Sequence, residues 1–132
     1  MSPVSPEFAM RYSQAWAERD PDAIVALHTD DMVFHMHGYA EPVTGRDAVR
    51  EAIAGVFGQS PDLRFEKRRV HFGDDHFVSE YDVSGTFGGR PFTCEGVDVF
   101  TLRDGLVARK DTYMDWLAVQ GQIGIDLTAT PA

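Results

Sequence analysis

The chain is poor in basic charge and cysteine, and it has no long apolar run. Its 12 lysines and arginines stand against 21 aspartates and glutamates, giving a formal net charge of −9. That balance argues against general affinity for nucleic acid or anionic membranes. The single cysteine, Cys94, excludes a disulfide within the chain and fits a reducing compartment, so we expect a cytoplasmic protein.

The sequence also shows no pattern typical of a membrane span or a signal peptide. No apolar stretch approaches the roughly 18 residues that a membrane span requires, so we expect no membrane partner. The first residues have neither the basic cluster nor the apolar centre of a signal peptide. With 132 residues, 43% of them hydrophobic, the chain has the size of one domain with a real core. We expect a single domain over 1–132, with frayed ends at 1–4 and 126–132.

The first half of the chain has the periodicity of helices. Ser5 is placed to cap a helix that begins at Pro6 and ends near Arg19. Further along, the pattern predicts four segments: a short helix from Asp20-Pro21, a strand at 32–37, a loop at 38–44 and a helix at 46–57.

The second half of the chain predicts long strands joined by tight turns. The strands are expected at 64–72, 76–87, 90–102 and 106–116. Gly88-Gly89 and Asp104-Gly105 are typical of two-residue hairpin turns. Helices followed by a curved antiparallel sheet make an α+β architecture, in which three N-terminal helices close over the concave face.

The two turns also predict which strand positions face each other. A tight turn at Asp104-Gly105 places Asp98 opposite Asp111, with Cβ atoms roughly 4.5–5.5 Å apart. A tight turn at Gly88-Gly89 places Ser79 opposite Asp98. Both hairpins together predict one inward face that carries Phe77, Ser79, Tyr81, Cys94, Asp98, Phe100, Asp111 and Tyr113.

Two adjacent carboxyl groups on an apolar face are suited to acid–base chemistry. Such surroundings raise the pKa of one group while the other stays ionised, which divides the pair into a proton donor and a proton acceptor. Tyr12, on the inward stripe of the first helix, is placed to donate to a developing oxyanion. A structural alternative remains open: Asp98 or Asp111 pairs with Arg109, which the same register puts on that side.

The chain resembles the ketosteroid isomerases. The residues that carry the resemblance are Arg11-Tyr12, Asp20, Asp22, 24–27, Asp30-Asp31, Glu41-Pro42, Gly45, 48–51 and 98–100. The wider group is the nuclear transport factor 2-like superfamily, which includes the SnoaL-like polyketide cyclases and the limonene epoxide hydrolases. The resemblance implies a cone-shaped fold. It matches Tyr12 and Asp98 to the two oxyanion-hole donors of the isomerases, with Asp98 protonated.

The chain departs from the isomerases at their catalytic base, an aspartate that corresponds here to Met36. By the same resemblance, Asp111 occupies a position that resembles an apolar pocket residue in those isomerases, so we expect a relocated acid or base there. The closing segment 115–124 resembles that of the SnoaL-like cyclases, whose catalytic aspartate corresponds to Asp115. We therefore expect Asp111, or Asp115 as the second choice, to move the proton.

These observations predict an acid–base enzyme, without cofactor or metal, that acts on a hydrophobic oxygenated small molecule. Isomerisation, cyclisation or dehydration next to a carbonyl is the leading reaction class. The expected catalytic residues are Asp98, Tyr12, Asp111, Asp115 and Arg109. The expected pocket residues are Trp16, Phe34, Met36, Phe57, Tyr81, Phe100, Tyr113 and Trp116.

Two other functions stay open. Asp98, Arg109 and Asp111 resemble in composition the trio of the limonene epoxide hydrolases, which activates water and protonates an epoxide. A non-catalytic binding or dimerisation module is the other alternative, and Met36 in place of the usual base supports it. We expect a homodimer in either case, because exposed sheet faces in such folds usually pair.

His35 and His37 form, with Glu41, a spacing that is typical of cupin metal sites. Met32, Phe34 and Met36 occupy the apolar side of the same strand, so both histidines should point to its outer face, and we expect no metal. Four further expectations concern structure: Cys94 in the core, and His28, His71 and His76 at the surface. The basic run Arg64, Lys67, Arg68 and Arg69 predicts a solvated strand face or a dimer contact.

Overall fold

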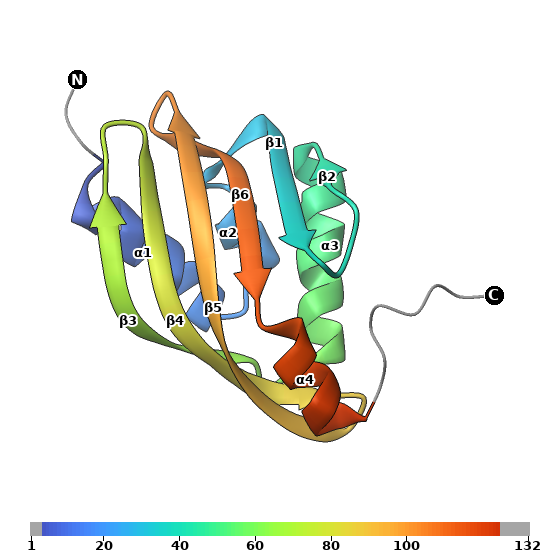
Figure 1. Ribbon diagram of the computed structural model, residues 1–132. Helices are drawn as coiled ribbons and strands as arrows, with labels where there is room; N and C mark the ends of the chain where they lie inside the picture. The colour runs from blue at the N-terminus through green and yellow to red at the C-terminus, as the bar shows by residue number, and fades with distance from the viewer. Residues whose placement is uncertain (1–3, 125–132) are drawn as a thin grey trace.

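A curved six-stranded sheet with helices against one face forms the fold (Figure 1). The computed structural model describes residues 4–124. Its elements are α1 (Pro6–Ala17), α2 (Pro21–Val25), β1 (His28–His37), β2 (Val43–Thr44), α3 (Arg46–Gln59), β3 (Arg64–Phe72), β4 (His76–Phe87), β5 (Arg90–Arg103), β6 (Leu106–Met114) and α4 (Trp116–Ile123). None of the helices in this range combines the length and apolarity needed to cross a membrane.

The strands follow the order β2-β1-β6-β5-β4-β3, and β1 runs parallel to β6 while the other pairs are antiparallel. Helices α1, α2 and α3 lie behind the sheet in Figure 1. Their apolar side chains form one core with buried residues of the sheet, including Phe34, Phe77 and Phe100. We call the face that these helices cover the inner face, and the opposite one the outer face. This arrangement confirms the predicted α+β class.

Local signals at the N-terminus place α1 as expected. The Ser5 side chain accepts a hydrogen bond from Phe8 N at 3.2 Å, and Pro6 occupies the first helical position. Phe8, Tyr12 and Trp16 form the buried stripe of this helix. The chain is already held at Val4, which is buried and whose N donates to Gly73 O at 2.9 Å. The expected frayed end at 1–4 is therefore wrong for Val4, and 126–132 lie outside the described residues.

The hairpin between β4 and β5 has the predicted register. Phe87 faces Arg90 across Gly88-Gly89, and Ser79 faces Asp98. Both turn glycines have positive φ, which the mirror-image hairpin turns require. Asp98 consequently lies on the inner face together with Phe100, and both side chains are buried.

A bulge at Ala108 breaks the predicted register of the next hairpin. The turn itself is as expected, since Arg103 faces Leu106. Val107 then pairs with Leu102 but Arg109 pairs with Thr101, so Ala108 is one extra residue in β6. A shift of one residue sends every later side chain to the opposite face. The predicted pairing of Asp98 with Asp111 is therefore wrong: Asp98 faces Thr112 instead.

Three further differences concern the extent of the strands. The strand predicted to reach residue 116 stops at Met114, and α4 follows it. Strand β1 begins at His28 rather than at 32, because its first residue pairs with Val107 of β6. Within the expected loop 38–44, Val43 and Thr44 form β2, which pairs with Phe34 and Val33.

Candidate active site

Two adjacent cavities lie against the inner face of the sheet. The larger has a volume of about 400 Å³ and the smaller about 60 Å³. The residues that border both are Trp16, Leu63, Phe65, Tyr81, Asp98 and Lys110. Strands β4, β5 and β6 thus supply a phenol, a carboxyl group and an amine to one apolar space.

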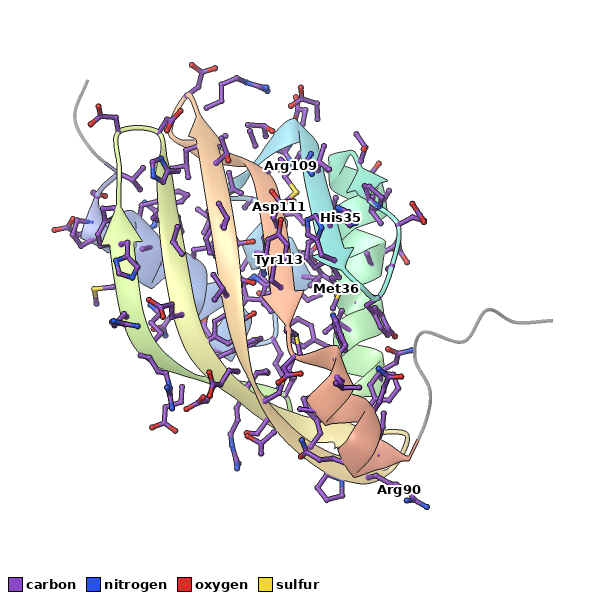
Figure 2. All side chains as sticks on the ribbon, in the orientation of Figure 1. His35, Met36, Arg90, Arg109, Asp111 and Tyr113 are labelled. Carbon is purple, nitrogen blue, oxygen red and sulfur yellow. The ribbon has the colours of Figure 1, made fainter. Side chains whose placement is uncertain are left out.

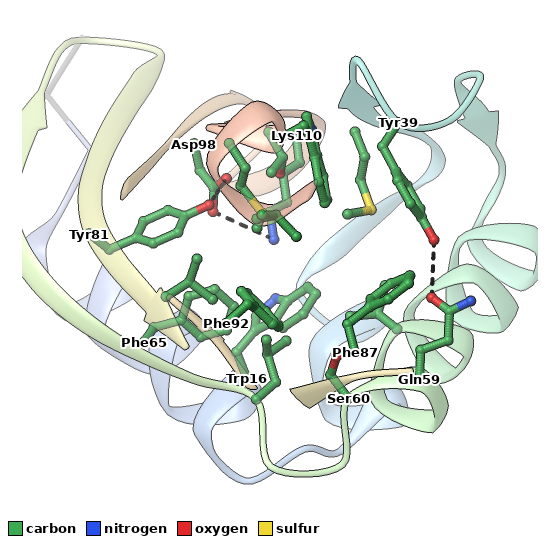
Figure 3. Close-up of a pocket in the computed structure, with 18 of the residues that line it drawn as sticks. Trp16, Tyr39, Gln59, Ser60, Phe65, Tyr81, Phe87, Phe92, Asp98 and Lys110 are labelled. Atoms are coloured by element: carbon green, nitrogen blue, oxygen red, sulfur yellow. Dashed lines mark hydrogen bonds and ion pairs between the residues drawn. The ribbon is translucent and has the colours of Figure 1, made fainter. Parts of the chain in front are cut away.

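Asp98 and Lys110 form a buried pair of opposite charge at this shared wall. The Lys110 Nζ atom lies 3.7 Å from Asp98 Oδ2, and the side chains are 5% and 9% exposed, respectively. Tyr81 Oη donates a hydrogen bond of 2.8 Å to the other carboxylate oxygen, Oδ1. Figure 3 shows the Lys110 amine pointing into the cavity, with Asp98 and Tyr81 beside it.

Burial controls the protonation of this group of side chains. Desolvation lowers the pKa of Lys110, and the nearby Asp98 carboxylate opposes that effect only in part. The same burial, reinforced by Asp98, raises the pKa of Tyr81 well above its ordinary value. Tyr81 therefore stays a neutral hydrogen-bond donor at physiological pH, while Lys110 loses its proton more readily than an exposed lysine.

Aromatic rings surround the Lys110 amine. Its Nζ lies 3.7 Å from the centre of the Trp16 ring, 5.2 Å from that of Phe34 and 5.6 Å from that of Phe100. Ring faces attract a cation through their quadrupole, so the ammonium form keeps some stabilisation without water. The lining of the site is consequently apolar in composition and yet tolerant of positive charge.

Gly96 allows Tyr81 to reach Asp98. The two residues face each other across β4 and β5. A Cβ atom on Gly96 would lie 2.7 Å from Tyr81 Cε1 and 2.9 Å from Tyr81 Oη, which is closer than non-bonded atoms approach. The missing side chain at this position therefore lets the Tyr81 ring lie across β5.

Tyr12 borders the larger cavity, and its hydroxyl lies 2.8 Å from Nε2 of His28. Desolvation, followed by the positive charges of Lys110 and Arg46, lowers the pKa of His28 to about 3. His28 is fully buried, so its predicted surface position is wrong. The reason is the early start of β1, which carries His28 into the core beside Val107.

Three of the expected catalytic or pocket residues lie on the outer face because of the Ala108 bulge: Arg109, Asp111 and Tyr113 (Figure 2). Arg109 Nε lies 2.8 Å from Asp111 Oδ2, and its second nitrogen lies 3.0 Å from Oδ1. Partial burial raises the pKa of Asp111, but the hydrogen bonds from Arg109 and His37 outweigh it and hold the pKa below its usual value. Asp98, Arg109 and Asp111 therefore do not assemble as the expected trio.

The two histidines of β1 share the outer face with Asp111, as their alternation with Met32 and Phe34 predicts. His37 Nε2 lies 2.7 Å from Asp111 Oδ1, and the rings of His35 and His37 are 3.6 Å apart. One possible ligand atom from each of His35, His37 and Asp111 falls within 4.8 Å of the others. Arg109 already occupies both carboxylate oxygens, so we assign no metal to this cluster.

Asp115, the second choice for the base, caps a helix instead of lining the cavities. Its side chain accepts a hydrogen bond from Ala118 N at 3.1 Å, at the exposed start of α4. Trp116 borders the smaller cavity and donates from Nε1 to His37 O at 2.8 Å. Phe57 packs 5.3 Å from Trp16, between ring centres, but borders neither cavity.

The remaining expected site residues border at least one cavity: Tyr12, Trp16, Phe34, Met36, Tyr81, Asp98 and Phe100. Lys110 is the residue that the sequence pattern missed. A regular hairpin would point it outward, and Ala108 is not a residue type that marks a bulge. Cys94 is buried as expected, and burial raises the pKa of its thiol to about 11.

Comparison with known proteins agrees with this architecture. A structure of a hypothetical protein from Catenulispora acidiphila DSM 44928, with a ketosteroid isomerase-like fold and in complex with trimethylamine, has a TM-score of 0.84. It is 21% identical and covers 96% of this chain and 99% of its own. A putative SnoaL-like polyketide cyclase from Jannaschia sp. CCS1 has a TM-score of 0.78 and 23% identity, covering 99% of this chain and 98% of its own.

A putative polyketide cyclase from Xanthomonas campestris pv. campestris has a TM-score of 0.76 at 21% identity, covering 89% of this chain and 94% of its own. A search of the curated proteins gave no match. The SnoaL-like domain family matches residues 9–110. That range contains most of the sheet and the pair Asp98 and Lys110. The chain belongs to the SnoaL-like domain family.

Proposed function

We propose that the protein is a cofactor-independent isomerase or cyclase that moves a proton next to a carbonyl of a hydrophobic oxygenated molecule. The observation that supports this function is the buried group Asp98, Tyr81 and Lys110 at the wall shared by two apolar cavities. Membership of the SnoaL-like family agrees with the reaction class. The larger cavity, of about 400 Å³, falls in the range of small-molecule sites.

Asp98 and Lys110 would divide the acid and base roles. The Asp98 carboxylate, held by Tyr81, takes a proton from the carbon beside the carbonyl. The Lys110 ammonium donates to the oxygen that gains charge, which a low-dielectric site makes effective. Tyr12, on the wall of the larger cavity, is the proposed second donor to that oxygen. The aromatic rings around Lys110 would hold the apolar body of the substrate.

The test is a panel of steroid ketones, polyketides and terpenoid ketones incubated with purified protein and followed by chromatography. Asp98→Asn removes the proposed base, whereas Asp111→Asn makes the same chemical change on the outer face. We expect turnover to fall at least a hundredfold in Asp98→Asn, in line with the usual contribution of a general base, and to stay within about twofold in Asp111→Asn. Full activity of Asp98→Asn would remove that residue from the mechanism.

A non-catalytic binding module is the second candidate. Met36, at the position of the isomerase base, borders the smaller cavity and offers no proton acceptor. The Asp98 carboxylate is also already engaged by Tyr81 and Lys110. Tight binding of a panel member without conversion, unchanged in Asp98→Asn, would favour the binding module over the enzyme.

A further inference from the structure

We propose that Lys110 is a nucleophile whose amine condenses with the carbonyl carbon of an aldehyde or ketone bound in the larger cavity, forming an imine. This inference extends the proposed function by naming a carbonyl compound as the ligand. It does not require turnover, since an imine can form with any suitable carbonyl compound that reaches the amine.

The position of the amine supports this chemistry. Lys110 borders both cavities, and Figure 3, which draws the lining of the smaller one, shows its Nζ atom directed toward the other lining side chains. Its 3.7 Å separation from Asp98 Oδ2 is longer than a hydrogen bond of an ammonium to a carboxylate. The amine therefore lies at the wall that both cavities share, beside Asp98 but beyond direct hydrogen-bond distance of it.

The surroundings favour the reactive form. Only the neutral amine attacks a carbonyl, and burial lowers the pKa of Lys110, which is the usual way in which a protein activates a lysine. The rings of Trp16 and Phe34 nevertheless attract a cation. They would therefore stabilise the protonated imine once it has formed.

Asp98 is placed to carry the protons of the condensation. The ammonium first gives one proton to the Asp98 carboxylate. The free amine then attacks the carbonyl carbon, so that a C–N bond forms and the oxygen becomes the hydroxyl of a carbinolamine after transfer of a proton from nitrogen. Asp98 returns its proton to that hydroxyl, the C–O bond breaks, and water leaves. The products are the protonated imine, the Asp98 carboxylate and one water, and no oxidant or reductant takes part.

The chain contains its own control for this chemistry, because Lys67 is its only other lysine. Lys67 also borders the larger cavity, but its position on β3 is exposed. A reagent that merely collects at the cavity or reacts with any amine would label Lys67 as well as Lys110. Selective reaction at Lys110 therefore distinguishes a lysine that its site activates from the general reactivity of lysine amines.

The experiment incubates the protein at pH 6.5 with 2-naphthaldehyde, as a hydrophobic carbonyl probe, and reduces any imine with sodium cyanoborohydride. We expect a single adduct, heavier than the protein by the mass of the aldehyde minus one oxygen, and peptide mapping that places it on Lys110. Lys110→Arg, which keeps the positive charge but removes the nucleophilic amine, should lower the yield at least tenfold. Glyoxylate, a small polar aldehyde, should give much less adduct.

The outcome that overturns the inference is adduct on Lys67 or the N-terminal amine in preference to Lys110. Peptide mapping of the wild-type protein decides this point even where a variant fails to fold. The result is also distinct from a failure of the proposed function: turnover of a ketone without a trapped Lys110 adduct refutes only the covalent step. A Lys110 adduct without turnover supports the covalent step and counts against the acid–base enzyme.

Discussion

The amine of Lys110 lies 3.7 Å from the centre of the Trp16 ring, inside the molecule and away from bulk water. Helix α1, which carries Trp16, and strand β6, which carries Lys110, therefore pack around this amine. Within residues 4–124, the carboxylate paired with it is that of Asp98, at 3.7 Å. Buried pairs of this kind contribute little net stability, but the removal of one partner alone is costly because the other charge stays unpaired. The pair thus links the stability of the core to the chemistry of the site.

We expect Lys110→Met to lower the free energy of unfolding by about 3 kcal/mol, because it strands the Asp98 carboxylate among apolar side chains. The double variant Asp98→Asn/Lys110→Met should recover most of that loss. Urea denaturation of the wild type, both single variants and the double variant measures the coupling between the two sites. Additive effects of the two substitutions would contradict a direct interaction.

Gly96→Ala tests the close approach of Tyr81 to β5. The added methyl group would lie under 3 Å from the ring, so Tyr81 must shift and lengthen its hydrogen bond to Asp98. We expect a loss of stability of about 1–3 kcal/mol, the usual cost of overpacking, together with reduced turnover. Tyr81→Phe is the matched variant, since it removes the same hydrogen bond without adding volume and should lower turnover with a smaller loss of stability.

His28 predicts how stability depends on pH. Its pKa is about 3 in the folded protein against roughly 6.5 in an unfolded chain, so only the unfolded state binds the proton between these values. The contribution of neutral His28 to the free energy of unfolding is complete above about pH 6.5 and is lost as the pH falls toward 3. From pH 7 to pH 5 the wild type should lose about 2 kcal/mol more than His28→Gln, measured by denaturant unfolding at each pH.

Much of the fold could be predicted because its signals are local. Ser5 with Pro6, and Gly88-Gly89 with its flanking strands, determine a helix start and a hairpin register from neighbouring residues alone. The Ala108 bulge has no such signal, since it arises where β6 must pair with β5 on one side and with β1 on the other. One unforeseen residue therefore reversed the predicted faces of Asp111 and Lys110.

Insertion of one alanine after Ala108 tests this account of the register. With the bulge still taking up a single residue, the longer strand would send Lys110 outward and bring Arg109 and Asp111 into the apolar core. We expect the insertion variant to be severely destabilised, by more than about 3 kcal/mol, because it buries charges without their partners. Deletion of Ala108 is the control, since a regular hairpin without it keeps Arg109 opposite Thr101 and Lys110 opposite Phe100, and circular dichroism thermal melts compare the two. Equal melting temperatures would show that the bulge does not set the register.

The outer face of β1 and β6 is where we expect a second copy of the chain to bind. Tyr113 is 48% exposed there, beside the group formed by His37, Arg109 and Asp111. Tyr113→Glu should convert the proposed homodimer to a monomer in sedimentation velocity, since it introduces charge at the centre of that surface. Arg11→Glu, on exposed α1, is the control. A wild type that sediments as a monomer at high concentration would contradict the proposal.

The extra residue at position 108 also bears on how related chains should be matched. Where a bulge does not take up an added or missing residue in β6, the side chains that meet the ligand exchange places with those on the outer face, while the strand stays in place. Two members of the family can therefore share backbone geometry and still present different chemical groups to their substrates. An alignment that ignores such a change would equate Lys110 of this chain with residues that never enter a binding cavity.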